Sequence, residues 1–180
     1  MRTAIVLSLA FLLGCTNMSE SVKDPSIGIN GGFEFEKNDI PINWLVYSPR
    51  TVPDGEFSIS FDNVDKIEGN QSLRMDILNC DTTGGWLSPG IAQEFPKMQG
   101  QRFRASIWIK SIESKYQVKF DRVNELEAQE INSWKGANHD WQKIEREITL
   151  TDPFDKFRIE INGLASGTLW IDHFAMEMLD

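Results

Sequence analysis

The sequence predicts an all-β protein built as a β-sandwich of two antiparallel sheets. Apolar and polar residues alternate with a period of two in several short runs, as in strands with one buried face. Clusters rich in Gly, Pro, Asp and Asn separate these runs and predict turns. Only residues 124–132 look helical, and they fit either a helical turn or a long loop. Many short strands divided by turns favour a β-sandwich over an α/β fold.

Residues 1–14 have the features of a signal peptide. Arg2 supplies a positive start, and residues 4–13 are apolar except for Ser8. A transmembrane helix needs roughly 20 apolar residues, so this run is too short to span a bilayer. Residues 12–15, Leu-Leu-Gly-Cys, resemble the lipobox of bacterial lipoproteins, in which the cysteine becomes the lipid-bearing first residue. We therefore expect acylation, for example with palmitate, at Cys15; an ordinary signal peptide with a chance cysteine is the alternative.

Residues 15–28 are polar, lack periodicity and contain a proline, which predicts a flexible tether after the lipidated cysteine. Residues 29–180 then form one domain. Removal of residues 1–14 takes away Arg2 and no acid, so 17 basic and 27 acidic residues remain, a net charge of −10. Such an acidic chain has little attraction for nucleic acid or anionic lipid headgroups, so we expect the lipid alone to hold it to the membrane. Thr16 is not the Asp that retains many lipoproteins in the inner membrane, which favours the outer membrane of a bacterial cell envelope.

Strands are expected throughout the predicted domain. The alternating runs are 57–61, 73–80, 103–110, 116–121, 144–148, 157–161 and 169–176. Cys80 closes one of these runs and is the only cysteine besides Cys15, which excludes an intrachain disulfide and a zinc cluster in the mature chain. A packed structural thiol is favoured over a nucleophile.

Five landmarks follow one another along the chain in a familiar order. They are Asn30-Gly31-Gly32-Phe33-Glu34 with Pro41 and Trp44; Gly69 to Met75; Gln101 to Lys110; Trp141 with its following strand; and Gly167 to Asp172. Together they resemble the galactose-binding-like jelly rolls, especially carbohydrate-binding modules of the cellulase-associated CenC type. The resemblance implies a jelly-roll sandwich from about residue 29 to the end, and it specifies fold far better than ligand.

The same resemblance implies a structural calcium ion, because members of this family commonly hold one between the first and last strands. The matching residues are Glu34 and Asp172, whose carboxylates would suit a hard cation. The alternative is that both are polar positions at strand ends. His173 stands where the family often has a second acid, which weakens the metal interpretation.

Six tryptophans make the chain rich in indole rings, which stack well on sugar faces. Trp44, Trp108, Trp141 and Trp170 match framework positions of the family and are expected to be structural. Trp86 and Trp134 match none and lie in polar, glycine-containing surroundings, so they are candidate ligand contacts, with folding back over the core edge as the alternative. Candidate polar helpers on the non-core face of the strands are Arg74, Asp76, Gln93, Lys119 and Asp121; a solvated face is the alternative for each.

Catalysis is poorly supported by the sequence. It contains no G-x-S-x-G elbow, no phosphate-binding glycine loop and no H-E-x-x-H motif. Glu34 and Glu36 could share a strand face, but a structural or metal role is favoured there. We expect a non-catalytic, surface-anchored lipoprotein that binds a glycan. The alternative is a protein–protein interaction module, or a subunit of a cell-envelope complex, that uses the same loops.

Overall fold

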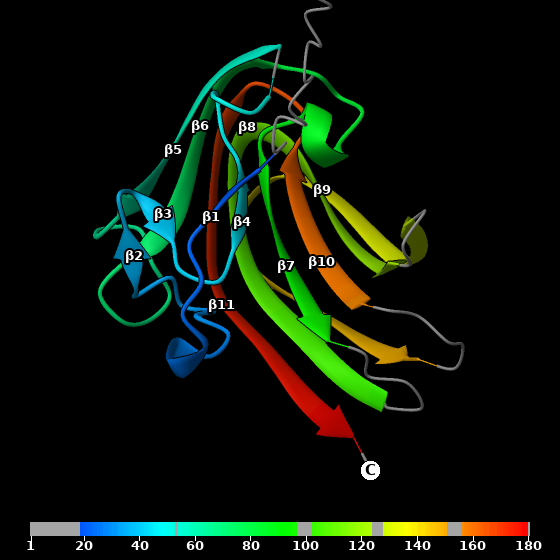
Figure 1. Cartoon of the computed structure of the whole chain (residues 1–180). Helices are drawn as coiled ribbons and strands as arrows, with labels where there is room; N and C mark the ends of the chain where they lie inside the picture. Colours follow the sequence, from blue (N-terminus) through cyan, green and yellow to red (C-terminus); the bar gives the residue numbers. More distant parts are fainter. Residues whose placement is uncertain (1–18, 53, 97–101, 124–127, 151–155, 180) are drawn as a thin grey trace, which may run out of the picture.

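The computed structural model describes residues 19–52, 54–96, 102–123, 128–150 and 156–179, which form strands and two short 3₁₀ turns and contain no α-helix (Figure 1). The signal peptide and Cys15 lie outside the described residues. The strands are β1 (Glu20–Ser21), β2 (Glu36–Lys37), β3 (Ile40–Pro41), β4 (Leu45–Tyr47), β5 (Gly55–Asp62), β6 (Ser72–Cys80), β7 (Gly90–Pro96), β8 (Arg102–Val123), β9 (Ala128–Thr149), β10 (Lys156–Gly163) and β11 (Gly167–Leu179). The 3₁₀ turns are η1 (Pro25–Ile27) and η2 (Gly85–Leu87). The described residues contain no helix long and apolar enough to cross a membrane.

The two long strands β8 and β9 run through both layers of the sandwich. The first half of β8 pairs with β11, and its second half pairs with β10 (Figure 1). The ladder between β8 and β9 is irregular from Ile109 to Lys115, where both strands turn from one layer into the other. The first layer is therefore β5-β6-β11-β8-β9 and the second is β1-β4-β7-β10-β8-β9, all antiparallel. This arrangement confirms the expected two-sheet sandwich.

The core lies between the two layers and follows the alternation in the sequence. Phe103, Ile107, Ile159 and Ile171 are among the side chains that fill it. Trp44 closes one end, fully buried, with its indole Nε1 donating to the Asn30 carbonyl at 3.1 Å. Its ring centroid lies 5.2 Å from that of Phe33 and 5.6 Å from that of Phe174, so this tryptophan joins the segment before β2 to β11.

The tether predicted at residues 15–28 is too long, because residues 20–28 are bound to the sandwich. Glu20 and Ser21 pair with β4, and the Asn43 side chain binds the chain at two further points. Its Nδ2 donates to the carbonyls of Asp24 and Gly28 at 2.7 and 2.8 Å. Residues 20–28 therefore belong to the sandwich, because the buried amide of Asn43 satisfies backbone groups that a tether would leave to water.

Two further expectations about strands are corrected. The runs 103–110 and 116–121 belong to one bent strand, β8, rather than to two strands. Residues 128–132, expected to be helical or loop, are strand at the start of β9, paired with the end of β8. Cys80 behaves as expected of a packed thiol: it is half-buried, its Sγ lies 3.8 Å from the Gly163 carbonyl, and burial raises its pKa.

Candidate functional site

The outward side of the second layer carries a continuous row of polar side chains. The alternation that places Ile159 and Ile161 in the core turns Arg158, Glu160 and Asn162 outward on β10. Neighbouring strands add their own outward residues, which the register places side by side. We call this surface the polar face; its residues are Tyr47, Glu94, Lys115, Gln117, Lys119, Asp121, Lys135, Arg158, Glu160 and Asn162.

Two carboxylates and one ammonium group form the centre of the polar face. Asp121 and Glu160 are only 2% and 3% exposed, and Lys119 Nζ lies 3.7 and 3.1 Å from their oxygens. Burial raises the pKa of the Asp121 carboxyl, and Lys119 opposes that shift. Burial also opposes the charge of Lys119, but Glu160 and Asp121 outweigh it and raise its pKa. The three groups therefore form one buried, mutually compensated unit.

Tyr47 joins this unit from β4. Burial and the hydrogen-bonded carboxylate of Glu160 raise the pKa of the Tyr47 phenol, so the hydroxyl stays protonated. β7 lies between β4 and β10 and contributes only Gly90, which has no side chain, and Ala92, which has a small one, at these outward positions. Tyr47 can therefore approach β10. A Cβ on Gly90 would lie 2.5 Å from the Asn162 side chain, so no larger residue fits there.

The end of the polar face where β7 ends and β10 begins carries a second ion group. Glu94 accepts from Lys156 Nζ at 2.8 Å and from Arg158 Nε at 3.2 Å. Although burial favours protonation, the two cations lower the pKa of the Glu94 carboxyl. The charged groups here are thus also paired.

Trp86 stands at the opposite end of the face, on η2. Gly84 and Gly85 precede it with φ of 85° and 65°, values that suit glycine, so the chain can turn sharply there. Gly85 N–H donates to Asn162 Oδ1 at 2.9 Å, and Asn162 Nδ2 donates to the Gly85 carbonyl at 2.9 Å. Trp86 remains 45% exposed. The turn therefore presents an indole beside the polar face and is fixed to it by Asn162.

The structure brings three predicted site residues together: Trp86, Lys119 and Asp121. The others lie elsewhere. Gln93 is on the core-facing side of β7, 4% exposed, and its Nε2 donates to the Ile29 carbonyl at 3.0 Å. The expectation that Gln93 belongs to the non-core face was wrong. Trp134 also faces inward, packs against the core and lies under the Arg146 guanidinium, 4.6 Å from its ring centroid.

Arg74 and Asp76 lie on the outward side of the first layer, away from the polar face. Arg74 Nη2 is 2.9 Å from Asp76, and the guanidinium lies 5.2 Å from the Trp170 ring centroid. Lys110 Nζ lies 5.1 Å from the same centroid. Trp170 donates its indole N–H to Asp62 at 2.9 Å. This tryptophan is thus buried under cations on an outer face rather than in the core between the layers.

Glu34 and Asp172 bind the same turn of the backbone. Asp172, fully buried, accepts from the N–H groups of Ile67 and Glu68 at 2.8 and 3.2 Å. Glu34 accepts from the N–H of Asn70 at 2.8 Å. Both carboxylates thus face N–H donors, a set that does not complete a calcium site, and no three His, Cys, Asp or Glu side chains within the described ranges are placed to share a metal ion. Calcium at Glu34 and Asp172 stays a prediction.

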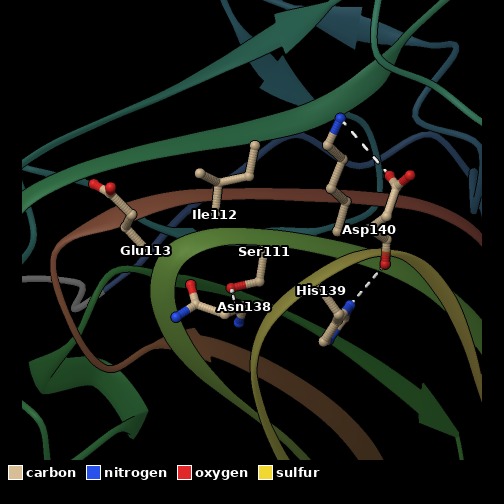
Figure 2. Close-up of a pocket in the computed structure, with 7 residues that line it drawn as sticks. Ser111, Ile112, Glu113, Asn138, His139 and Asp140 are labelled. Carbon is tan, nitrogen blue, oxygen red and sulfur yellow. Dashed lines mark hydrogen bonds and ion pairs between the residues drawn. The ribbon is translucent and has the colours of Figure 1, made fainter.

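A separate hollow of about 520 Å³ lies at the bend of β8 and β9 (Figure 2). His139 donates from Nδ1 to the Asp140 carbonyl at 2.8 Å, which leaves Nε2 to accept from the Tyr116 hydroxyl at 2.7 Å. Lys110 is held by Asp65 at 2.7 Å. The ring and the ammonium group in this hollow are therefore bound within the protein itself.

Sequence reasoning missed eight of the ten members of the polar face, among them Tyr47, Arg158, Glu160 and Asn162. The signal for three of them was present, because residues 156–163, Lys-Phe-Arg-Ile-Glu-Ile-Asn-Gly, alternate strictly. In such a run the residues between the predicted core positions point to the opposite face, so these three polar residues are predicted to face outward. Tyr47 gave no such signal, since it lies on a strand of three residues.

Comparison with solved structures places the fold among carbohydrate-binding modules, whereas no protein-family model and no curated protein matches. The CBM22-1 xylan-binding domain of Paenibacillus barcinonensis Xyn10C is similar with a TM-score of 0.59 at 12% identity, over 83% of this chain and 92% of that one. A CBM4 structure gives 0.60 at 16% identity, over 83% and 98%. The C-terminal family 22 module of Clostridium thermocellum Xyn10B gives 0.56 at 14% identity, over 83% and 94%. At these identities the likeness shows the shared β-sandwich fold.

Proposed function

We propose that this protein is a non-catalytic, lipid-anchored module of the bacterial cell envelope that binds carbohydrate on the polar face. One observation carries the proposal: Asn162 fixes an exposed indole, Trp86, at the end of a face whose polar side chains are buried and already oriented. An exposed ring beside fixed donors and acceptors is the combination by which proteins hold sugars.

The physical support lies in the charges of the polar face. Buried charges such as Asp121, Lys119 and Glu160 lose their hydration on folding, which costs free energy that a well-packed apolar group would not cost. A protein that keeps them on an outward face holds hydrogen-bonding groups in fixed positions. Asp121 and Glu160 hold Lys119 in position but are themselves buried, so the groups of the face that a sugar hydroxyl reaches are the ammonium groups of Lys119, Lys115 and Lys135. A pyranose ring places its C–H groups on Trp86.

The structural comparisons support the same class of ligand. One similar domain is named as xylan-binding, and the other similar folds include modules of families 4 and 22. Shared fold alone does not transfer a ligand. The proposal therefore depends on the polar face of this chain, and the comparisons only favour carbohydrate over other ligands.

The proposal excludes catalysis by Asp121 and Glu160. Glycosidases use a carboxylic acid and a carboxylate with different protonation on either side of the scissile bond. Here Asp121 and Glu160 are 2% and 3% exposed and both contact Lys119, so neither carboxylate is open to a scissile bond. The lipid anchor at Cys15 is proposed from the sequence; incorporation of labelled palmitate that is lost in Cys15→Ala tests it.

Calorimetric titration of the domain against xylan, β-glucan, mannan and uronate oligosaccharides tests the binding function. We expect one class to bind with a Kd between about 1 μM and 1 mM, and Trp86→Ala to weaken it about tenfold or more. Leu78→Ala is the matched control, because Leu78 is an exposed apolar side chain (69%) on the first layer. If none of the four oligosaccharide classes binds, and a protein that co-purifies with wild type is lost in Trp86→Ala, the protein-interaction alternative is favoured instead.

A further inference from the structure

Two lysines at the Trp86 end of the polar face have no carboxylate partner. The other cations of this face, Lys119 and Arg158, each contact an acid. Lys115 and Lys135 form no ion pair within the ranges that the structure describes, although the chain carries 27 acidic residues against 18 basic ones. In so acidic a protein, two neighbouring unpaired ammonium groups need an explanation.

Both lysines line the same hollow, which has a volume of about 350 Å³. Its other lining residues are Tyr116, Gly136, Ala137 and Leu164, and none of them is acidic. Gly136 makes room for the Tyr116 ring, whose hydroxyl would lie 2.3 Å from a Cβ at that position. The hollow thus has an apolar floor and two ammonium groups at its sides, with space for about one sugar residue.

The hollow adjoins the turn that carries Trp86. Lys135 pairs with Gln117, and Gln117 pairs with Asn162, the residue that holds this turn. A Cβ on Gly84 would lie 3.7 Å from the Leu164 side chain and 3.5 Å from Gln117 Oε1. The side chains between the hollow and the turn are therefore contiguous.

Charge divides the polar face along its length. Glu94 and Asp121 lie on the positions of the register away from Trp86, whereas Glu160 lies nearer, since its Oε1 would be 4.0 Å from a Cβ on Gly85; each of the three contacts a cation. At the Trp86 end the amides of Gln117 and Asn162 are buried, and the ammonium groups of Lys115 and Lys135 are exposed. A ligand in the hollow therefore meets two ammonium groups and none of the carboxylates of the face.

We infer that the glycan bound here carries carboxylates, as in a uronic-acid oligosaccharide, with one sugar ring on Trp86 and a carboxylate in the hollow between Lys115 and Lys135. This inference rests on the proposed function. An ammonium–carboxylate hydrogen bond is stronger than one to a neutral hydroxyl, so these two lysines distinguish an acidic sugar from a neutral one. The overall negative charge of the protein repels a polyanion at long range, so the selectivity has to come from this local pair.

The test uses oligosaccharides of galacturonic, glucuronic and mannuronic acid, each beside its methyl ester, titrated into the whole domain by calorimetry. The ester keeps the ring and its stacking surface but removes the charge. We expect at least one acid to bind about tenfold more tightly than its ester. Lys115→Gln/Lys135→Gln should abolish that preference, so that acid and ester bind with equal affinity. Lys37→Gln/Lys143→Gln, which removes the same charge outside the face, should keep it.

The inference is overturned if no acid binds more tightly than its ester, or if the preference survives in Lys115→Gln/Lys135→Gln. Binding of neutral xylan or glucan oligosaccharides that depends on Trp86 would then leave the proposed function standing. Absence of binding to acids, esters and neutral oligosaccharides alike overturns both. Circular dichroism of the double variant checks that it folds, and single Lys115→Arg and Lys135→Arg variants should retain the preference because they retain the charge.

Discussion

Asn162 on β10 and Gly85 on η2 bind each other through two hydrogen bonds, although they are 77 residues apart in sequence. The amide of Asn162 is fully buried and uses one donor and one acceptor on a single glycine. Through this pair, the floor of the polar face sets the position of Trp86. The exposed indole is therefore part of a fixed surface rather than of an independent loop.

Replacement of Asn162 by Ala should weaken glycan binding about as much as loss of the indole. Gly85 N–H would lose its partner, its carbonyl would keep only the N–H of Ser88, and the turn would lose its link to β10. We expect the free energy of unfolding to fall by about 1–3 kcal/mol, because two part-buried hydrogen bonds are lost. Urea denaturation measures the stability, and titration with the bound glycan measures the affinity. Asn132→Ala, on β9, which pairs with β8, is the control; equal affinity in Asn162→Ala and wild type would show that the turn is held by other contacts.

Lys119→Met should destabilise the fold strongly. It leaves Asp121 and Glu160 buried without a cation, which costs about 3–5 kcal/mol when one partner of a buried pair is removed. The loss should shrink as the pH falls towards about 4, because burial raises the pKa of Asp121 and this carboxyl therefore loses its charge above its unfolded pKa, near 4. Denaturation of Lys119→Met at pH 7 and at pH 3.5 measures both effects.

The matched control is Lys143→Met. Lys143 contacts Glu145 at 2.8 Å, but both side chains are 44% exposed, so its loss should change stability by less than about 1 kcal/mol. Similar losses in the two variants would contradict the buried character of the Lys119 unit. Recovery of stability in Lys119→Met/Asp121→Asn/Glu160→Gln would support it.

Much of the fold follows from alternation alone. Val118 and Phe120 predict that Lys119 and Asp121 face outward, and the structure confirms this. The same rule would have placed Gln93 inward, because Ile91 shares its parity on β7. Gln93 was assigned to the outer face because it is polar, but its position in the strand determines the face to which its side chain points.

Other features have no signal in the sequence. β8 turns into the second layer at residues 111–115, which contain no glycine or proline. Glu113 nevertheless adopts a φ of 58°, in the left-handed region that glycine usually occupies. The bend depends on the packing of the two layers and not on local preference. The contact of Asn162 with Gly85 is likewise set by tertiary structure, since neither residue identifies its partner.

Stability in acid should depend on Asp62. Its carboxylate accepts the indole N–H of Trp170 at 2.9 Å and the N–H of Val64 at 2.9 Å, and these bonds lower its pKa to about 2. An acid whose pKa is depressed by folding stabilises the protein above its unfolded pKa, near 4. That contribution, up to about 2 kcal/mol, is lost as the pH falls from 4 through 2.

The measurement is the unfolding free energy of wild type and Asp62→Asn between pH 5 and pH 2. Wild type should be the more stable at pH 5, and the difference should narrow towards pH 2. A difference that stays constant over this range would refute the assigned pKa of Asp62. Asp39→Asn serves as an exposed control.

Asp172→Ala should open the end of the sandwich where the turn of residues 67–71 packs against β11. The carboxylate accepts N–H groups of Ile67 and Glu68 across more than 100 residues of sequence, and that of His173 at 2.7 Å. Loss of an acceptor for three donors predicts destabilisation by about 2–3 kcal/mol. Hydrogen exchange should show faster exchange at residues 67 and 68 in the variant, and protection unchanged from wild type would show that the carboxylate is not their main partner.

Calcium, predicted at Glu34 and Asp172, is tested by its effect on unfolding. A ligand bound only by the folded state adds about 2.7 kcal/mol at a concentration 100 times its Kd. If the two carboxylates bind the ion, calcium chloride should raise the melting temperature, EDTA should reverse the rise, and Glu34→Gln should abolish it. Magnesium at equal concentration controls for ionic strength, because its stricter octahedral geometry suits such a site less well. No calcium-dependent shift in wild type would mean that the N–H groups of residues 67–71 alone occupy these carboxylates, and that the turn needs no metal to stay in place.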